Sequence, residues 1–484
     1  MRKLLLTLML LLIVLVSCGE TKSDNPVSSD TTAAVDNETA AESTEPAKLT
    51  PDLPETDMNG KTFNIYTTGW YDYTPLQFVD LSPESASGET LNDAAYDRKL
   101  FIEQTYNCVV NHINESDMAV MVQNLKNSVM AQDNNYDTAF IRGTNFSEMI
   151  TGGYLLNLDD LPYVDFDNPW WSASSYKAFG IQNKHYGING AMSSNEMMAV
   201  WTVCFSKDII ENYDLESPYD LVKNGAWTFD KAVDMAKTTA HDIDGDGIMG
   251  EDDFWGINYT YDTVIGILNG AGVRLVDLDN NGTPAIKIDG EMEITRLQDI
   301  ITKLKNEDYS ADTLGKFDLQ GLDGKIFGAG RNLFMFTATH NVNALRQMDV
   351  EFGLIPYPKY DEAQADYMPG TAGIFLPILC VPATNTDLEN TGIFMEAFAA
   401  EGYYTVVPAF YDVILKSKLA RDDDSAEMLD YIYGNIIYDA GNVFNFGNFT
   451  RLIGGISTDV SSFLAANMNS LQKGIDDVLA EINK

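Results

Sequence analysis

A short acidic segment contains the clearest set of potential metal ligands in the chain. Three aspartates two residues apart point to one centre only when a hard cation gathers their oxygens, and Gly247 allows the sharp bend. The twelfth position is Asp rather than the longer Glu, and a strand is expected next, so a solvated acidic turn is the alternative. We predict a structural Ca²⁺ in an EF-hand-type loop, with oxygen ligands from Asp242, Asp244, Asp246, the Ile248 carbonyl and Asp253.

A second set of candidate residues follows predicted strands. Trp70, Tyr71 and Tyr73 come after an alternating strand pattern at residues 60–66, and aromatic rings suit the apolar C–H faces of pyranose sugars. The alternative is that these rings cover the edge of a domain. Arg142 follows the strand pattern of 136–141, where a guanidinium can hold sugar hydroxyls or a carboxylate. The alternative for Arg142 is a surface ion pair.

The charge balance excludes two classes of partner. The 484 residues include 72 acidic and 31 basic side chains, which gives a formal net charge of −41. Nucleic acid and an anionic membrane surface both require a cationic face. We therefore expect a solvated protein, and its 45% of hydrophobic residues suffices for sizeable cores in two or three domains.

The amino terminus has the features of a secretory leader. Two basic residues precede an apolar run over 4–16, which is too short to span a bilayer, so residues 1–17 are predicted to be a signal peptide. The motif Leu15-Val-Ser-Cys18 resembles a bacterial lipobox, which implies lipidation of Cys18; the alternative is an ordinary signal peptide cut near Ser17. Residues 18–50 would then be the lipidated cysteine and a disordered polar tether.

The other cysteines fit neither a disulfide framework nor a zinc site. Cys108, Cys204 and Cys380 each lie within an apolar, strand-like run, and their spacing matches no metal motif. We predict that all three are buried free thiols.

The order of expected elements predicts an α/β protein. The pattern alternates strand, helix, strand, helix and strand, which builds a parallel sheet with ligands at the carboxyl ends of its strands. A second acidic run around Asn280-Asn281-Gly282 has Ile288 at the twelfth position and alternating apolar flanks, so a hairpin is favoured over a metal loop. The expected helices cover 91–105, a segment capped by Ser116 that ends near Met130, a segment capped by Thr228, 291–306, 388–400, 428–437 and 460–482.

Two motifs resemble a known family. Gly225-Ala-Trp-Thr-Phe-Asp230, followed by the acidic turn, is similar to a helix start in the lipid-anchored extracellular solute-binding proteins of bacterial ABC importers, carbohydrate type. Pro169-Trp-Trp171 resembles another segment of that family, whose fold is that of maltose-binding protein. The resemblance covers roughly 60–480 and implies a two-lobed periplasmic-binding-protein-like fold. Each lobe would be a mainly parallel sheet flanked by helices, with a ligand cleft and a hinge between the lobes.

The resemblance also implies how the chain is divided. Residues 51–196 and 353–405 would form lobe 1, with 197–352 in lobe 2 and 406–484 mainly in lobe 2. One of the paired tryptophans would pack between elements and the other would approach the cleft. Together with the strand-end residues, the substrate-binding residues are predicted to be Trp70, Tyr71, Tyr73, Arg142, Trp170, Trp171, Glu196, Trp201, Thr339 and His340.

The function implied is capture of a carbohydrate, with an oligosaccharide as the expected class, and its delivery to ABC permease subunits. The protein would be a monomer, lipid-anchored at the extracellular face of the cytoplasmic membrane, without catalytic cofactor. The alternatives are a secreted glycan-active hydrolase, a binding protein for another solute such as a peptide, and a surface adhesion or scaffold protein. The sequence contains no G-x-S-x-G, H-E-x-x-H or Walker motif and only four histidines, so no catalytic signature favours the hydrolase.

Overall fold

The computed structural model gives the architecture of most of the chain, and residues 50–484 group into one compact unit. Within this unit, strands of the described residues form two larger sheets. Each of these sheets is called a lobe below, together with the helices that pack on it. The described residues are 48–69, 78–288, 290–317, 324–345, 348–373, 375–420 and 422–484.

The lobe 1 sheet has the strand order β13-β3-β1-β2, formed by β1 (Lys61–Thr68), β2 (Cys108–Glu115), β3 (Thr138–Arg142) and β13 (Pro377–Cys380). β1 is parallel to β2 and to β3, whereas β13 is antiparallel to β3. The central parallel strands are those that the alternation in the sequence predicts.

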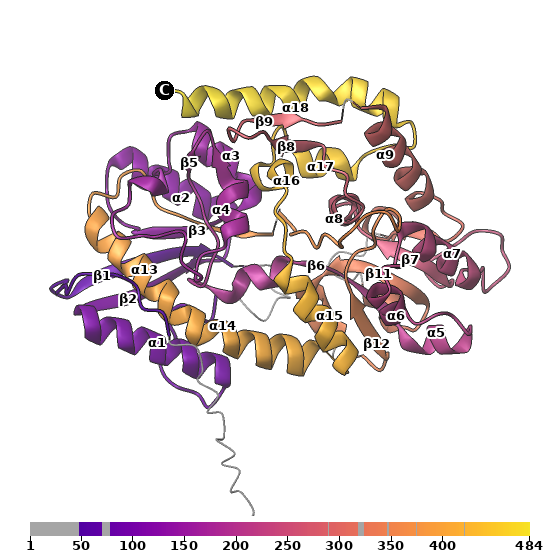
Figure 1. Ribbon diagram of the computed structural model, residues 1–484, viewed down its shortest axis with the longest axis horizontal. Helices are drawn as coiled ribbons and strands as arrows, with labels where there is room; N and C mark the ends of the chain where they lie inside the picture. The colour runs from indigo at the N-terminus through magenta and orange to yellow at the C-terminus, as the bar shows by residue number, and fades with distance from the viewer. Residues whose placement is uncertain are drawn as a thin grey trace, which may run out of the picture. The chain divides into compact units, whose positions relative to one another are not determined.

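Helices cover both faces of this sheet (Figure 1). Phe63 of β1 stacks on Phe394 of α13 (Leu388–Tyr404) with ring centroids 4.3 Å apart, and α13 packs beside α1 (Thr90–Tyr106). Tyr66 points to the opposite face, where its hydroxyl accepts a hydrogen bond from Asn124 of α2 (Met118–Ala131). The cap of α2 differs from the expectation: the side chain of Asp117, not Ser116, accepts the N–H groups of the first turn, because Asp117 directly precedes the helix.

The lobe 2 sheet has the order β10-β7-β11-β6-β12. β10, β7 and β11 run parallel to one another, and β6 is antiparallel to β11 and β12. Thr228 caps α7 (Phe229–Thr239), as predicted, by accepting the Lys231 N–H. The strands are β6 (Trp201–Ser206), β7 (Trp255–Tyr259), β10 (Ser310–Asp312), β11 (Asn332–Ala338) and β12 (Phe352–Ile355).

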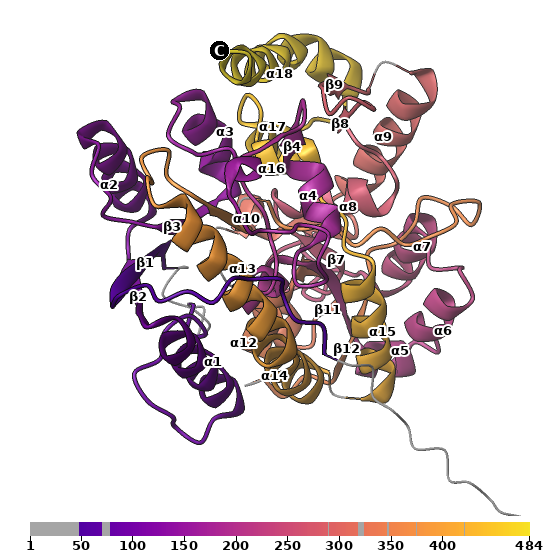
Figure 2. The same ribbon diagram turned by 60° about the vertical axis from the view of Figure 1, so that its left-hand side comes forward.

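The remaining elements include the carboxyl-terminal helix α18, which lies at the top of the view in Figure 2. They are α3 (Gly143–Thr151), η1 (Leu158–Asp160), α4 (Ala173–Phe179), β4 (Gly180–Ile181), β5 (Lys184–His185), η2 (Ser194–Ala199), α5 (Lys207–Asn212), α6 (Pro218–Lys223), α8 (Thr263–Gly270), β8 (Val276–Leu278), β9 (Pro284–Ile286), α9 (Glu291–Leu304), α10 (Thr313–Phe317), α11 (Gly324–Gly328), α12 (Thr339–Leu345), α14 (Val406–Ala409), the π-helix η3 (Phe410–Leu419), α15 (Asp423–Gly434), α16 (Ala440–Phe444), α17 (Phe449–Gly454) and α18 (Val460–Ile482).

Two local expectations are confirmed. β8 and β9 pair antiparallel around Asn280-Asn281-Gly282, so the second acidic run is a hairpin. Cys108, Cys204 and Cys380 are buried free thiols. In the described part of the chain, none of the helices combines the length and apolar character needed to cross a bilayer.

Several segments of the described residues run between the two lobes. The first crossing, residues 186–200, leaves lobe 1 beside β13 and enters β6, and the second, 356–376, returns from β12. After α13 the chain passes between the lobes again, because α15 packs on β12 of lobe 2, α16 on α3 of lobe 1 and α17 on α8. Val200 bridges Thr371, and the Trp201 N–H donates to the Gly370 carbonyl, so the first two crossings lie side by side. Short paired crossings of this kind are suited to hinge motion between the lobes.

A buried polar network holds the start of the first crossing. The Asp80 carboxylate accepts hydrogen bonds from Ser193 Oγ, from Ser194 N and Oγ, and from Asn195 Nδ2. The Arg98 guanidinium donates to the carbonyls of Asp80, Ala191 and Met192 and lies 3.8 Å from the centroid of the Phe398 ring. The segment up to Asn195 is therefore fixed to lobe 1.

Candidate functional site

Parallel strands place several polar residues at the carboxyl edges of the two sheets. Arg142 ends β3, and its Nη2 donates to the carbonyl of Gly69, just beyond β1, over 2.8 Å. In lobe 2, His340 follows β11 in the same way. Both side chains are buried, with 6% of each exposed. The carboxyl edge is where open α/β sheets bind ligands.

Arg142 and His340 belong to different lobes but are close enough to interact. Burial lowers the pKa of His340 to about 4, and the charge of Arg142 contributes to that shift. The imidazole is therefore neutral at pH 7. Its Nδ1 lies 3.2 Å from the carbonyl of Met198, which can only accept, so Nδ1 carries the proton and Nε2 is an acceptor. Thr339 beside it uses its hydroxyl to bind the carbonyls of Met197 and Val200.

Glu196 lies on the first crossing, in η2, as the sequence indicates. The residue is partly buried, but its Oε2 is fully buried and has no hydrogen-bond partner. Burial raises the pKa of Glu196 to about 8. Tyr438, from the segment between α15 and α16, is near enough for the Glu196 charge to raise its pKa further, after the larger effect of its own burial. With its raised pKa, Glu196 is mainly neutral at pH 7.

The raised pKa of Glu196 predicts a pH dependence. Because the folded carboxyl titrates near 8 and the unfolded one near 4.5, only the folded protein holds the proton between those values. This contribution to stability is full below about pH 4.5 and is lost as the pH rises toward 8. Glu196→Gln removes this titration. The melting temperature of the variant should therefore rise relative to that of the wild type as the pH increases from 5 to 8. A constant difference between the two melting curves over that range would contradict the assignment.

Two carboxylates at the same edge of lobe 2 were not singled out from the sequence. Asp262 follows β7 and accepts the hydroxyl proton of Thr260, and Asp312 ends β10 and accepts the Gly315 N–H over 2.9 Å. Burial raises the pKa of each carboxyl, and the charge of Asp312 adds to the shift at Asp262. The signal available was the position of each aspartate at a strand end, the same signal that identified Arg142.

The paired tryptophans are placed differently from the expectation that one approaches the cleft. Trp170 and Trp171 are both buried, with 1% and 3% exposed. The indole N–H of Trp171 donates to the Glu396 carboxylate of α13 over 2.7 Å, which draws the ring into lobe 1. Trp201 is also buried, at 2% exposed, and stacks near Tyr357. None of these three rings presents a face to solvent, and their contact with ligand stays a prediction.

The remaining predicted residues of this type lie outside the described part of the chain. They are Trp70, Tyr71, Tyr73 and Cys18. Among the described residues, the candidates for ligand contact are Arg142 from lobe 1, His340, Thr339, Asp262 and Asp312 from lobe 2, and Glu196 from the first crossing; their contact with a ligand stays a prediction.

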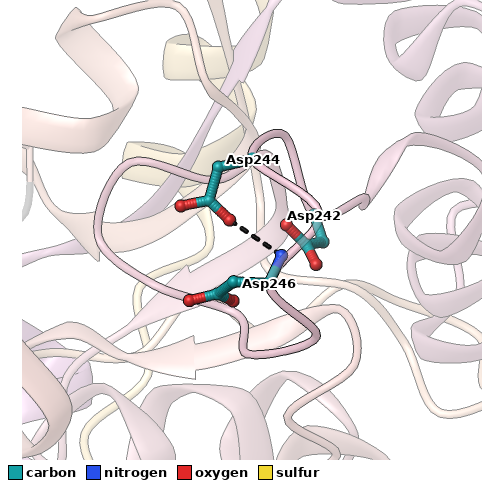
Figure 3. A group of neighbouring side chains, drawn as sticks. All are labelled: Asp242, Asp244 and Asp246. Atoms are coloured by element: carbon teal, nitrogen blue, oxygen red, sulfur yellow. Dashed lines mark hydrogen bonds between the residues drawn. The ribbon is translucent and has the colours of Figure 1, made fainter.

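The acidic loop after α7 gathers three of its predicted ligands (Figure 3). One carboxylate oxygen from each of Asp242, Asp244 and Asp246 lies within 4.8 Å of the others. Asp242 accepts the N–H groups of Gly247 and Gly245, and these bonds lower its pKa. The pKa of Asp244 is raised: its bond from the Asp246 N–H lowers it, but desolvation and the two neighbouring carboxylates outweigh that effect. The repulsion is what a divalent cation would relieve.

Asp253 lies outside this group of oxygens. Its Oδ1 accepts the Ile243 N–H over 2.7 Å and its Oδ2 accepts the Gly250 N–H over 2.6 Å, and the residue is buried. The Asp253 side chain thus closes the loop through backbone hydrogen bonds, and its direct ligation stays a prediction, as does that of the Ile248 carbonyl. The donor set that the structure brings together is oxygen-only, which fits Ca²⁺ and not zinc or copper.

Comparison with known proteins identifies the fold. No protein-family model and no curated protein sequence matches the chain. A sugar transporter from Rhizobium etli in an open conformation is similar with a TM-score of 0.55 and 14% identity, over 87% of this chain and 99% of that chain. A cyclo/maltodextrin-binding protein complexed with maltotetraose gives 0.54 and 12%, over 88% and 98%. An ABC substrate-binding protein from Listeria monocytogenes, in complex with cycloalternan, gives 0.53 and 13%, over 88% and 99%.

These similarities extend over nearly the whole of each neighbour. The chain therefore has the two-lobed α/β fold that the sequence resemblance implied. The lobe 1 sheet is mainly parallel, as expected, whereas the lobe 2 sheet is mixed, because β6 is antiparallel to both of its neighbours. The neighbours are binding proteins rather than enzymes. At identities of 12–14% the similarity establishes the fold and not the ligand.

Proposed function

We propose that this chain, which has the two-lobed fold of ABC sugar-binding proteins, is an extracellular solute-binding protein that captures an oligosaccharide and delivers it to an ABC permease. One observation carries the proposal. Arg142 at the carboxyl edge of the lobe 1 sheet lies close enough to His340 of lobe 2 to affect its pKa, on a fold shared with proteins solved with maltotetraose and cycloalternan.

The residues at these edges suit hydroxyl groups. A sugar hydroxyl both donates and accepts, so it can bind the Arg142 guanidinium, the acceptor Nε2 of His340 and the carboxyl groups of Asp262 and Asp312. A ligand that contacts both lobes makes its full set of bonds only when the lobes are close, and it therefore favours the closed state. No step of bond cleavage is required of these residues, and the proposed activity is binding without turnover.

A thermal-shift panel tests the proposed function. The mature chain carrying Cys18→Ser is heated with maltotetraose, mannotriose, cycloalternan and a set of short peptides. A ligand that binds only the folded state at 100 times its Kd adds about 2.7 kcal/mol, which is a clear rise in melting temperature. A rise with at least one saccharide and none of the peptides is expected. A rise with peptides alone would place the ligand in another class.

We also propose that Cys18 is lipidated and anchors the protein at the extracellular face of the cytoplasmic membrane. The lipobox-like motif and the polar tether after it support this proposal. Cell fractionation of the Cys18→Ala variant is the test: release of the protein into the medium is expected. Retention of the cleaved variant at the membrane would contradict the anchor.

Calcium binding by the 242–253 loop is proposed on the gathered oxygens of its three aspartates. The ion would stabilise lobe 2 and take no part in chemistry, because the loop lies next to α7 and not at a carboxyl edge.

Removal of the ion with a chelator tests the proposed calcium site. Excess EGTA should lower the melting temperature of the wild type and leave the double variant Asp244→Ala/Asp246→Ala unchanged, since the ion stabilises only a loop that can bind it. Calorimetry with and without the chelator is the measurement. An equal response of both proteins would place any bound ion elsewhere.

A further inference from the structure

The carboxyl-terminal helix contacts both lobes. α18 packs against α9 of lobe 2 and against α3 of lobe 1 (Figure 1). α9 is fixed to the rest of lobe 2 by the ion pair of Lys303 with Asp230 of α7, which is 2.5 Å long. α7 in turn packs on β7. A helix that joins α9 to α3 therefore connects two bodies that hinge motion would separate.

The amino-terminal end of α18 is held by one side chain of α9 and by apolar packing. Gln298 of α9 donates from Nε2 to the Thr458 carbonyl over 2.6 Å and accepts the Val460 N–H at Oε1 over 3.4 Å. Two residues of this half of the helix, Val460 and Leu464, are buried. Residues 465–466 and 469–470 are exposed, and Met468 between them is only partly buried against the core.

The carboxyl-terminal half is held more extensively. Its buried residues recur every three or four positions, and the Lys184 ammonium of β5 donates to the Ile482 carbonyl. Gly474 lies so close to the loop between α16 and α17 that a Cβ there would be 2.3 Å from the Gly447 nitrogen. Because α16 and α18 both pack on α3, we assign this half to lobe 1. The buried residues are Leu471, Ile475, Val478 and Ile482.

We propose that α18 is a strap that limits how far the lobes open, and that the contact of Gln298 with 458–460 is the catch that is released when they separate. This inference follows from the difference between the two ends of α18. When the lobes separate, the end with fewer contacts should detach first. The proposal rests on the proposed function in one respect: the strap would regulate access of the ligand to the site between the lobes. Loss of the catch favours the open state and so weakens any ligand that needs the closed one.

Distance measurements without ligand test the strap. Spin labels are placed at Met130→Cys on α2 and Met292→Cys on α9, both exposed positions, in the mature chain carrying Cys18→Ser. The cysteines at 108, 204 and 380 are buried, so the introduced thiols take the labels. Double electron–electron resonance then compares the background protein with Gln298→Met and Gln298→Glu. The first substitution removes the amide at similar size, and the second replaces the donor to Thr458 with a carboxylate.

The matched control is Gln472→Met, which removes an exposed glutamine on α18 that binds only Asp476 of the same helix. The catch variants should shift the distances toward longer values, while the control leaves them unchanged. Superimposable distributions for the background and both catch variants would overturn the strap, whether or not a ligand is ever found.

Measurements of ligand affinity test whether the strap also regulates binding. For a saccharide identified in the thermal-shift panel, Gln298→Met should weaken binding by about fivefold or more, through coupling between the catch and the site. Longer distances with unchanged affinity would overturn the regulatory role. Absence of any saccharide ligand would count against the proposed function and would leave the distance result standing on its own.

Discussion

The substitution Asp80→Ala should lower the free energy of unfolding by about 3–5 kcal/mol, because it removes one partner from a buried charged network. The Asp80 carboxylate is fully buried and satisfies donors of Ser193, Ser194 and Asn195. Arg98, also buried, has its pKa lowered to about 10 by desolvation, an effect that the charge of Asp80 partly offsets. Without Asp80, the arginine charge loses this compensation and the donors of the first crossing are left unpaired.

Urea denaturation of the wild type and the variant measures this loss. Asp234→Ala is the control, since Asp234 is 74% exposed and its contact with Lys237 is 3.5 Å long; it should change stability by less than about 0.5 kcal/mol. Equal effects of the two substitutions would show that the Asp80 network does not hold the crossing.

The second large effect is expected on affinity. Arg142→Met keeps an apolar stem but removes the guanidinium from the carboxyl edge of lobe 1, where it is 6% exposed. Hydrogen bonds to a charged group contribute about 1.5–3 kcal/mol, so a saccharide bound by Arg142 should lose roughly ten- to a hundredfold in affinity. His340→Ala should weaken binding in the same direction, since it removes the acceptor from lobe 2.

Titration calorimetry with a saccharide from the thermal-shift panel measures these affinities. Arg331→Met is the matched control: Arg331 precedes β11 at the opposite edge of the lobe 2 sheet and binds Glu251 and Asp252. An unchanged Kd in Arg142→Met, with the melting temperature intact, would remove Arg142 from the site without excluding a ligand elsewhere.

The fold follows from patterns that are local in sequence. The alternation of strand and helix predicts the parallel core of lobe 1, and Thr228 caps α7 because its side chain precedes the first turn. The two acidic runs could also be distinguished from their local sequence. Alternating apolar residues around Asn280-Asn281-Gly282 give the hairpin of β8 and β9, whereas the run at 242–246 gathers its carboxylates.

The site follows from contacts that are distant in sequence. Trp170 and Trp171 are both buried, and the Trp171 indole N–H donates to Glu396, 225 residues later in the chain. No feature of the local sequence indicates that partner. Asp80 and Ser193 are 113 residues apart, so their network could not be read from spacing. Similarly, Tyr438 comes close to Glu196 from the segment between α15 and α16, which is far from Glu196 in the sequence. Position at a strand end, by contrast, identified Arg142 and His340 and would also have identified Asp262.

The loop that contains Trp70, Tyr71 and Tyr73 is outside the described residues, and its role as an aromatic platform stays a prediction. Trp70→Ala, measured with the same saccharide, would extend the affinity series to that loop.

The central claim, that the chain binds a saccharide between its lobes and does not convert it, can be tested in one measurement. Proton NMR spectra of maltotetraose and of mannotriose are followed for a day with an equimolar amount of the mature chain carrying Cys18→Ser. The account predicts that resonances of at least one saccharide broaden or shift on addition of protein and that its anomeric signals otherwise persist unchanged. New reducing-end signals would show hydrolysis and contradict the binding-protein account, and spectra unaffected by protein for both saccharides would contradict the proposed ligand class.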